Sequence, residues 1–464
     1  MLSSRNLIVN GGFAGAAPDG SLRGWDAPDG ASWQRIAVPE YTAAGLPQSG
    51  FAMQVTIGPG RAGGALHQRV ALPPGLPGRF ALRVAARGRA GRRGLRLAVS
   101  VALPDGPQTI AEAHFALARD WQRHRLAFDV AGFRVPASVD VTIHASGGTG
   151  SICVTDIRLV ALNAAAAPLA LRFDTRGDLS LASSRLRAWT IADYLDLVGW
   201  PVAMNRGDAF DLYVCQKVRH RLRLRRARRD GRAVLYDLDD NEPLISTRET
   251  RDIRAFVKAV DGATAGSAFL REMMAAWNDN TMLFENPVDV LDPDIAHQGE
   301  VWDGRLVWFG MPENLWMLRE LHLTQPVTTI TRGGDIEYSL KSVDRHLVDF
   351  DLALLPVFLN DETRAKNANR LVKCVGLGLP FLATDTPEHR RALQRLQLPA
   401  SLLVAPDGDW PARIVEIGKC YADCKRLLTE ARPRAFEVYG IERIAAEWVA
   451  FCRQILAAKA LAAP

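Results

Sequence analysis

The sequence has no apolar run that approaches the roughly 20 residues needed to span a bilayer. Its first residues, MLSSRNLIVNGGF, lack the apolar core of roughly 7–15 residues typical of a secretory signal, so we expect a cytoplasmic protein. There are only 6 cysteines, and none forms a CxxC pair. Cys420 and Cys424 have helical spacing, but no histidine pair stands at zinc-ligand spacing. We therefore predict reduced, structural thiols and no metal site.

The positive charge is unevenly spread. The formal net charge is +6, and the run RHRLRLRRARRD from Arg219 to Asp230 holds 7 arginines in 12 residues. A solvated helix face is the commonest meaning of such a run. The second interpretation is an anionic substrate, or acidic lipid headgroups that would hold Arg219–Arg229 peripherally at the inner membrane face. No aromatic-plus-basic motif accompanies the run, so we expect no nucleic-acid partner.

The first 162 residues contain short segments in which apolar and polar residues alternate. Turn signals such as PDG, PPG and SGG separate them. Alternation with frequent turns is typical of an antiparallel sandwich, which we predict for residues 1–162. An alanine-rich tract then predicts a linker over 163–170. The segments are FAMQVTI, FALRVAA, LRLAVSVAL, HRLAFDV, VDVTIHA and ICVTDIRLVAL.

The rest of the chain alternates apolar strands with amphipathic helices. Strand–helix alternation predicts right-handed crossovers and parallel sheets. There are about ten candidate strands, and a break at Asp292–Gly304 divides them into two sheets. The chain is thus expected to be multidomain, with two α/β Rossmann-like domains at 171–300 and 301–440. A helix over 441–464 closes it.

In parallel sheets, ligands bind beyond the carboxyl ends of the strands. The most informative loop is Asp361–Arg390, which follows the strand DLALLP. We predict that its helix begins near Lys366 to Asn369, and that Gly376 and Gly378 end it. Backbone N–H groups at a helix start, with Lys366 and Arg370 beside them, form a site for a diphosphate.

Five segments, in order, resemble GT-B-fold glycosyltransferases of the family 4-like type. They are SSRLRAW (183–189), VLYDLDDN (234–241), FENPVD (284–289), LVWFG (306–310) and KNANRLVKCVGLGLPFLATDTPEHR (366–390). The resemblance implies an acceptor half, a donor half, and a terminal helix that crosses back onto the acceptor half. It also implies a hexosyltransferase-type enzyme with a nucleotide-diphosphate sugar as co-substrate and no other cofactor.

The resemblance also implies residue roles. Lys366, Asn369 and Arg370 would bind the donor diphosphate, with Gly310 and Arg332 completing the donor site. Because a Lys–Arg pair can neutralise a diphosphate, we expect no essential Mg²⁺. The carboxylates of Asp239 and Asp240 could accept the acceptor's proton. Asp237, Asn241, Arg185 and Arg187 would bind the acceptor; a helix cap, a solvated residue or a surface helix start are the structural alternatives for these groups.

One departure from the family concerns two glutamates that many retaining members carry before a G-x-P strand entry. The corresponding positions here are Ala365 and Lys373, although Glu362 lies close enough to substitute for the first. This departure supports the alternative of a non-catalytic glycan-binding protein on a degenerate GT-B scaffold. We interpret His389, which follows Pro387, as structural.

The N-terminal segment has a second resemblance. NLIVNGGFAGAAPDGSLRGW (6–25) and the closing VTDIRLVAL are similar to the jelly-roll carbohydrate-binding modules of the galactose-binding-like superfold. Such modules stack aromatic faces on sugar rings, and Trp33 and Tyr41 are candidates. We expect Trp25 and Trp121 in the core.

Together these expectations describe a transferase that moves a sugar from a nucleotide donor to a glycan, lipid-linked or protein acceptor. The alanine- and arginine-rich composition is typical of a GC-rich bacterial genome, in which such enzymes build surface polysaccharides.

Overall fold

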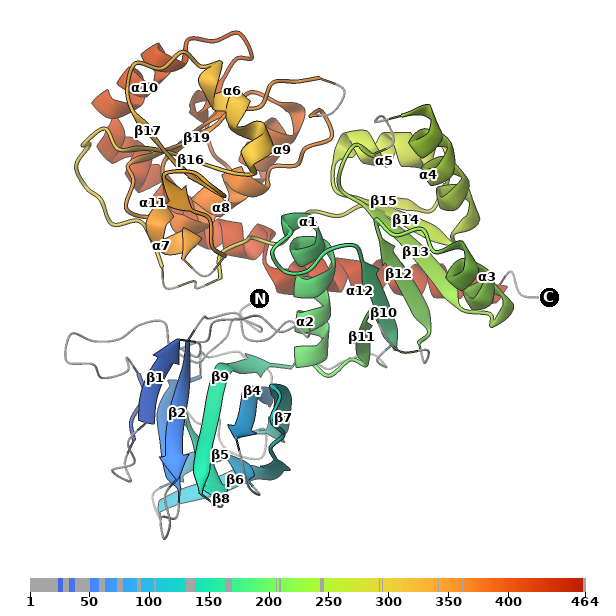
Figure 1. The fold of residues 1–464 in the computed structure, drawn as a ribbon, viewed down its shortest axis with the longest axis vertical. Coiled ribbons are helices and arrows are strands. Elements are labelled where there is room, and N and C mark those ends of the chain that lie inside the picture. Colours follow the sequence, from blue (N-terminus) through green and yellow to red (C-terminus); the bar gives the residue numbers. More distant parts are fainter. Residues whose placement is uncertain are drawn as a thin grey trace. The chain divides into compact units, whose positions relative to one another are not determined.

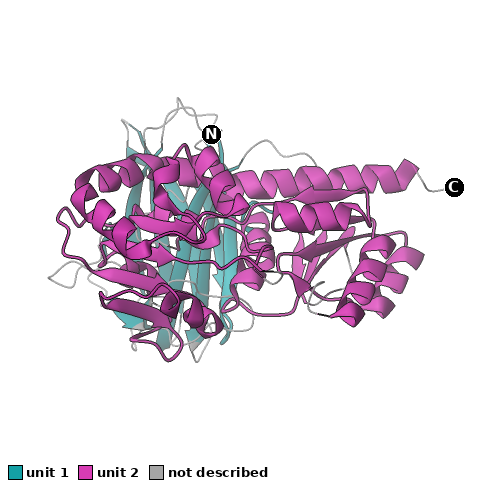
Figure 2. Ribbon diagram, turned by 90° about the horizontal axis from the view of Figure 1, so that it is seen from above, with its two compact units in different colours: residues 1–168, 197–199 teal, residues 169–196, 200–464 magenta. Residues whose placement is uncertain are grey.

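The chain forms two compact units, Met1–Pro168 with Leu197–Gly199, and Leu169–Asp196 with Trp200–Pro464 (Figure 2). Each is described by itself below. The computed structural model describes residues 24–27, 33–37, 51–57, 63–72, 78–89, 93–103, 106–130, 138–147, 149–162, 169–205, 207, 210–242, 246–291, 293, 295–340, 342–360 and 363–461.

The first unit is a β-sandwich of one five-stranded and one four-stranded sheet, in which neighbouring strands are antiparallel throughout the described part. Side chains alternate between core and solvent: Leu95, Leu97 and Val99 are fully buried inside. The first sheet has the order β1 (Trp33–Ala37), β2 (Phe51–Ile57), β9 (Gly150–Ala161), β4 (Arg79–Arg89), β7 (Gln122–Asp129). The second has the order β3 (Gly64–Ala71), β8 (Ser138–Gly147), β5 (Arg93–Leu103), β6 (Gly106–Ala116).

The second unit contains two parallel sheets of six strands each (Figure 1). The order of the first is β11 (Val202–Met204), β10 (Leu171–Thr175), β12 (Leu212–Gln216), β13 (Ala233–Leu238), β14 (Gly262–Ala265), β15 (Thr281–Leu283). The order of the second is β18 (Ile336–Glu337), β17 (Val327–Thr331), β16 (Leu306–Phe309), β19 (Leu352–Leu355), β20 (Phe381–Thr384), β21 (Leu403–Val404). We call the regions around these sheets the first half and the second half.

Both strand orders reverse direction once, and this fixes where a ligand can enter. The first strand of each half, β10 or β16, has the next strand of the chain on one side and a later strand, β12 or β19, on the other. The connecting helices therefore leave in opposite directions at these two places. In open α/β sheets, the carboxyl ends of the strands at such a reversal are the usual place for a ligand to bind.

Helices connect the strands and begin at the residues that cap them. The Ser246, Ser267, Thr386 and Asp409 side chains accept hydrogen bonds from backbone N–H groups at four helix starts. The first half has α1 (Ala182–Ser184), the π-helical turn η1 (Arg185–Trp189), α2 (Thr190–Leu197), α3 (Arg221–Arg229), α4 (Thr247–Ala259) and α5 (Ala268–Ala275). The second half has η3 (Pro312–Asn314), α6 (Leu315–Arg319), α7 (Val343–Leu347), α8 (Asn369–Leu377), α9 (Pro387–Leu396), η4 (Ala400–Leu402), α10 (Trp410–Lys419) and α11 (Tyr421–Val438).

The last helix, α12 (Ile441–Leu461), packs against the first half although it follows the second half in sequence. Its fully buried Trp448 lies 5.7 Å from the ring of Phe173 in β10 and 5.6 Å from that of Phe284. The apolar face of the helix thus covers the first sheet. No helix in the described part of the chain is long and apolar enough to cross a membrane.

Candidate functional site

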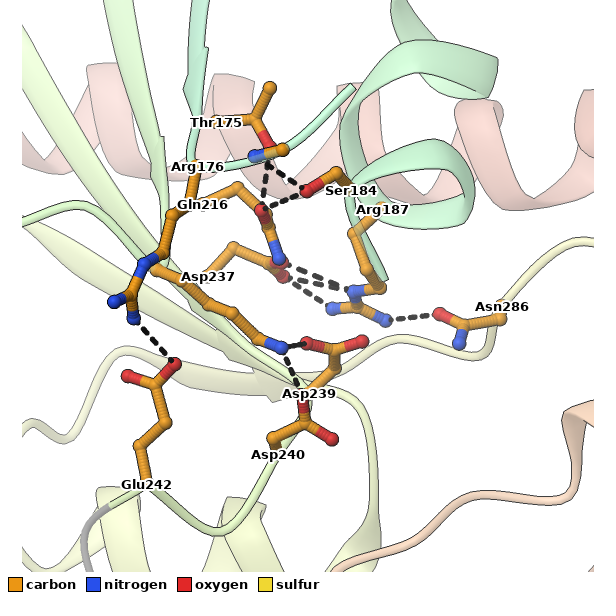
Figure 3. Close-up of polar contacts among 12 residues, drawn as sticks. Thr175, Arg176, Ser184, Arg187, Gln216, Asp237, Asp239, Asp240, Glu242 and Asn286 are labelled. Atoms are coloured by element: carbon orange, nitrogen blue, oxygen red, sulfur yellow. Dashed lines mark hydrogen bonds and ion pairs between the residues drawn. The ribbon is translucent and has the colours of Figure 1, made fainter. Parts of the chain in front are cut away.

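Buried ion pairs hold the carboxyl edge of the first sheet together (Figure 3). The Arg187 Nε donates to both oxygens of Asp237, at 3.1 and 3.2 Å, and its Nη1 donates to Asn286 Oδ1 at 3.0 Å. Thr264 Oγ1 donates to Asp237 at 2.6 Å. Arg187 and Asp237 are 1% and 0% exposed. Burial opposes the charge of Arg187, but Asp237 outweighs it and raises the pKa of the guanidinium.

A second buried arginine ties the two halves together. Arg185 donates to Asp289 at 3.2 and 2.7 Å, and Lys373 of α8 donates to the backbone carbonyl of Asp289. Lys373 also pairs with Asp344 of α7. Burial raises the pKa of Asp289, but the charges of Arg185 and Lys373 more than offset this and lower it overall.

These placements change the interpretation of three sequence-predicted residues. Arg185, Arg187 and Asp237 are all buried, and their charged groups are engaged with one another or with other side chains. Direct acceptor contact by these residues stays a prediction; in this structure their charged groups are taken up by buried ion pairs. We interpret them as supports that fix the edge of the sheet. Arg185 and Arg187 belong to a π-helical turn, a feature frequent at functional sites.

Beyond this layer lies a lysine–aspartate cluster. Lys217, directly after β12, has its Nζ 2.9 Å from Asp239 and also contacts Asp240. The Asp239 side chain is 4% exposed and that of Asp240 57%, so a ligand can reach Asp240. Burial raises the pKa of Asp239 to about 6, against the opposing charge of Lys217. Asn241, the next residue in the sequence, is also buried.

Lys217 is a site residue that the sequence analysis missed. It follows the strand LYVCQ directly and adopts a left-handed backbone with φ of 58°. A single lysine after a strand resembles any solvated loop residue. The available signal was that Lys217 directly follows a strand, and that the next strand in the sheet ends in the D-x-D-D run Asp237–Asp240.

The second half places Arg370 at the reversal point of its sheet. Arg370, in the first turn of α8, donates to the carbonyl of Phe309 at 3.1 Å and to that of Pro356 at 3.4 Å. Phe309 ends β16 and Pro356 directly follows β19. No carboxylate in the described ranges pairs with this half-buried guanidinium, and burial lowers its pKa to about 10. Few arginines are left in such an environment.

The other predicted donor residues lie around Arg370 with one exception. A Cβ on Gly310 would lie 3.5 Å from Arg370 Nη1, so the glycine borders the guanidinium. The Lys366 Nζ donates to Asn314 Oδ1 at 2.7 Å, and Asn369 is the first residue of α8. As predicted, the helix starts in this segment and Gly378, with φ of 66°, ends it, whereas Gly376 lies within the helix rather than at its end. Arg332 is exposed in the turn after β17, and no described contact joins it to the others.

The loop before α8 and the carboxylates after β13 meet at Gly266. A Cβ on this glycine would lie 2.7 Å from the Cβ of Asp239 and 3.7 Å from Asn367 Nδ2. Ala365 packs into the apolar cluster of the first half, and Arg364 stacks 4.6 Å above Phe269. The segment that carries Lys366 therefore lies against the edge that carries Asp239.

Several predicted residues lie elsewhere or outside the described residues. Glu362 and Tyr41 are outside them. Trp33 is half-buried and packs against the sandwich core. Trp25 and Trp121 are buried, which confirms their core assignment.

His389 and the cysteines have structural environments. His389 is buried, and its Nδ1 donates to the carbonyl of Thr384 at 2.6 Å. Burial lowers the pKa of His389 to about 4, so the ring is neutral. All six cysteines are free thiols, and only Cys420 is exposed. The described residues contain no group of three or more His, Cys, Asp or Glu side chains that could hold a metal ion.

No family model and no curated protein matches the sequence. Similar solved structures exist for each part. HepE from Anabaena, in complex with UDP, has a TM-score of 0.42 at 11% identity and covers 62% of this chain and 100% of its own. TmCBM61 in complex with β-1,4-galactotriose has a TM-score of 0.25 at 18% identity; the match covers 34% of this chain and 99% of TmCBM61. The xylan-binding domain CBM22-1 of Xyn10C from Paenibacillus barcinonensis has a TM-score of 0.27 at 13% identity; the match covers 36% of this chain and 99% of that domain.

The fold is an antiparallel β-sandwich followed by two parallel α/β sheets. Likenesses with identities and TM-scores this low carry no argument about function. The strand pairing of the chain itself confirms the predicted fold class. Function has to be argued from the side chains at the two sheet edges.

Proposed function

We propose that the chain is a glycosyltransferase that moves a sugar from a nucleotide-diphosphate donor to a glycan, lipid-linked or protein acceptor. The observation that carries the proposal is Arg370: a half-buried guanidinium at a sheet's reversal point, bonded only to backbone carbonyls among its described partners. A buried cation without a counter-ion is costly, and an anionic ligand removes that cost. A diphosphate fits, because guanidinium forks match phosphate oxygens.

The neighbours of Arg370 supply what a diphosphate leaving group requires. Lys366 adds a second cation, and the first turn of α8, which begins at Asn369, adds backbone N–H groups and the positive end of the helix dipole. Gly310 leaves room beside the guanidinium. These groups would stabilise negative charge as the bond to the sugar breaks. Arg332 would have to reach the site from its exposed turn.

We propose Asp239 and Asp240 as the groups that receive the acceptor's proton. A carboxylate with a pKa of about 6, such as Asp239, is ionised at neutral pH yet basic enough to take a proton. Lys217 pairs with both carboxylates and holds them in place. The contact at Gly266 brings these carboxylates to the loop that carries Lys366. A sugar held on the diphosphate would therefore lie next to the proton acceptor.

The positions where retaining relatives carry glutamates serve packing here. Ala365 is buried in the first half's apolar cluster, and Lys373 is buried between Asp289 and Asp344. Neither can act as a sugar-binding carboxylate. The proposed chemistry therefore uses the Asp239–Asp240 pair. The assignment of the sandwich as a glycan-binding module, with Trp33 and Tyr41 as stacking residues, stays a prediction, as does a peripheral membrane contact through Arg219–Arg229.

A thermal-shift titration with UDP, GDP, TDP and CMP, with and without Mg²⁺, tests the proposal. A ligand that binds only the folded state at a hundredfold excess over its Kd adds about 2.7 kcal/mol of stability. We expect one nucleotide to raise the melting temperature of the wild type and of Arg319→Gln, an exposed arginine of the same half, but not of Arg370→Gln. EDTA should leave the shift unchanged. Absence of a shift with every nucleotide would favour a non-catalytic glycan-binding protein.

A further inference from the structure

A hollow of about 480 Å³ lies where helices α3 and α4 begin, at the carboxyl edge of the first sheet. Guanidinium groups dominate its lining. The lining residues are Arg219, Arg221, Arg248, Arg251 and Asp252. Four cations and one anion around a single hollow form an environment for a negatively charged ligand.

Two of the four arginines have acidic partners, and the described residues offer none to the other two. The Arg219 Nη2 donates to Glu249 at 2.6 Å, and Arg221 pairs with Asp252 at 2.9 Å. Arg248 and Arg251 are exposed, and neither forms an ion pair within the part of the chain that the structure describes. The paired arginines are thus held in position, while the other two retain their full donor capacity.

The ligand chemistry follows from the guanidinium group. Its planar fork forms two parallel hydrogen bonds to the oxygens of a phosphate, and several forks around one hollow suit a group with many such oxygens. The hollow offers a single carboxylate, Asp252, and that carboxylate is already paired. A cationic or neutral ligand would find few acceptors there. A phosphate or diphosphate therefore matches the lining best.

The position of the hollow connects it to the proposed proton acceptors. Arg219 follows Lys217 by two residues, and Lys217 binds Asp239 and Asp240. Glu242 follows Asp240 by two residues, and Arg219 donates to it at 3.3 Å. The hollow is thus connected to the carboxylate pair through two loops. One follows β12 and carries Lys217 and Arg219, and the other follows β13 and carries Asp239, Asp240 and Glu242.

We infer that this hollow binds a phosphate or diphosphate group of the acceptor substrate, so that an acceptor hydroxyl extends toward Asp239 and Asp240. Naming the ligand as acceptor rests on the proposed glycosyltransferase function, whereas anion binding itself does not. The phosphate could belong to a phosphorylated sugar or to the headgroup of a lipid-linked acceptor. Both present the same oxygens to the arginines.

Calorimetric titration of the full chain with inorganic pyrophosphate tests the inference. The titration uses an Arg370→Gln background, so that the proposed donor site does not contribute. We expect pyrophosphate to bind this protein, and to bind at least about tenfold more weakly when Arg248→Gln and Arg251→Gln are added, because two hydrogen bonds between charged groups are lost. The matched control is Arg254→Gln with Lys258→Gln, exposed residues of the same helix that remove the same charge.

Three outcomes would overturn the inference. They are the absence of pyrophosphate binding in the Arg370→Gln background, an equal effect of the two double replacements, and no effect of the Arg248 and Arg251 pair. The proposed donor site is judged separately, by whether Arg370→Gln alone abolishes the nucleotide-dependent shift in melting temperature. Either idea can therefore fail while the other stands.

Vesicles distinguish the sources of the phosphate. Co-sedimentation with phosphatidylglycerol–phosphatidylcholine vesicles that is lost in Arg248→Gln/Arg251→Gln protein indicates a lipid-borne phosphate. Pyrophosphate binding without vesicle binding indicates a soluble phosphorylated acceptor. Leu222 of α3 is 79% exposed beside arginines, so Leu222→Gln probes a general lipid surface. One combined result would refute the hollow as the anion site. In it, Leu222→Gln abolishes vesicle binding, Arg248→Gln/Arg251→Gln leaves vesicle binding unchanged, and pyrophosphate does not bind.

Discussion

Replacing Arg370 by glutamine should stabilise the ligand-free protein while removing its nucleotide binding. Burial lowers the pKa of Arg370 well below the ordinary arginine value, to about 10, so the folded state disfavours the charged form. At about 1.4 kcal/mol for each pKa unit, this corresponds to about 3 kcal/mol. The folded-state pKa lies below the unfolded one, so the cost is present throughout the range below pH 10 and disappears only as the pH rises above 10 toward the ordinary pKa of arginine.

The expected gain is smaller than that figure. The side chain is only half-buried and solvent screens part of the charge, and its hydrogen bonds to Phe309 and Pro356 are lost with it. We expect Arg370→Gln to gain about 1–2 kcal/mol, which raises the melting temperature by about 2–4 °C. Calorimetry of the ligand-free protein measures this. Arg370→Lys keeps the charge and should show no gain, and Arg319→Gln should leave the melting temperature unchanged. A lower melting temperature for Arg370→Gln alone would refute the idea of an uncompensated cation.

Three further predictions concern the first half. Asp239→Asn should abolish transfer, and wild-type activity should fall about tenfold for each pH unit below 6, as protonation of Asp239 removes the base; a pH–rate profile checks both. Lys217→Met should destabilise the fold by about 3–5 kcal/mol, since it leaves Asp239 buried without a counter-ion, and Lys217→Met/Asp239→Asn should recover most of this in denaturant unfolding. Trp448→Ala should cost about 3–5 kcal/mol through the cavity it leaves beside Phe173 and Phe284, lowering the melting transition of the second unit.

The sequence predicted strands best where a buried face repeats. The sandwich strands β2, β4, β5, β7, β8 and β9 show alternating apolar residues, and most strands of the parallel sheets are short continuous apolar runs between helical segments. The sequence analysis missed β1, β3 and β6, and the residues of β6 are mostly exposed. It also missed β11 and β18, which have only 3 and 2 residues and too little sequence to show a period.

The site was predictable where local sequence decides position. The start of α8 and the carboxylates after β13 follow from strand ends and helix starts. Partner choice does not follow from local sequence. Arg187 and Asp237 are 50 residues apart and pair only after β13 and η1 have packed. The contact of Lys217 with Asp239 depends in the same way on the neighbouring positions of β12 and β13. The sequence therefore did not show that Arg185, Arg187 and Asp237, the expected acceptor contacts, form buried ion pairs.

The most direct test of glycosyl transfer is the release of nucleoside diphosphate from nucleotide sugars. UDP-, GDP- and TDP-sugars are incubated with the protein and with a panel of glycan and lipid-phosphate acceptors, and the released nucleotide is quantified by chromatography. We predict release by the wild type and by Arg319→Gln, and a rate at least about 100-fold lower for Arg370→Gln, because the charge on the leaving diphosphate loses its main stabilising group. Intact nucleotide sugars in every wild-type reaction, or equal release by wild type and Arg370→Gln, would contradict the proposed function.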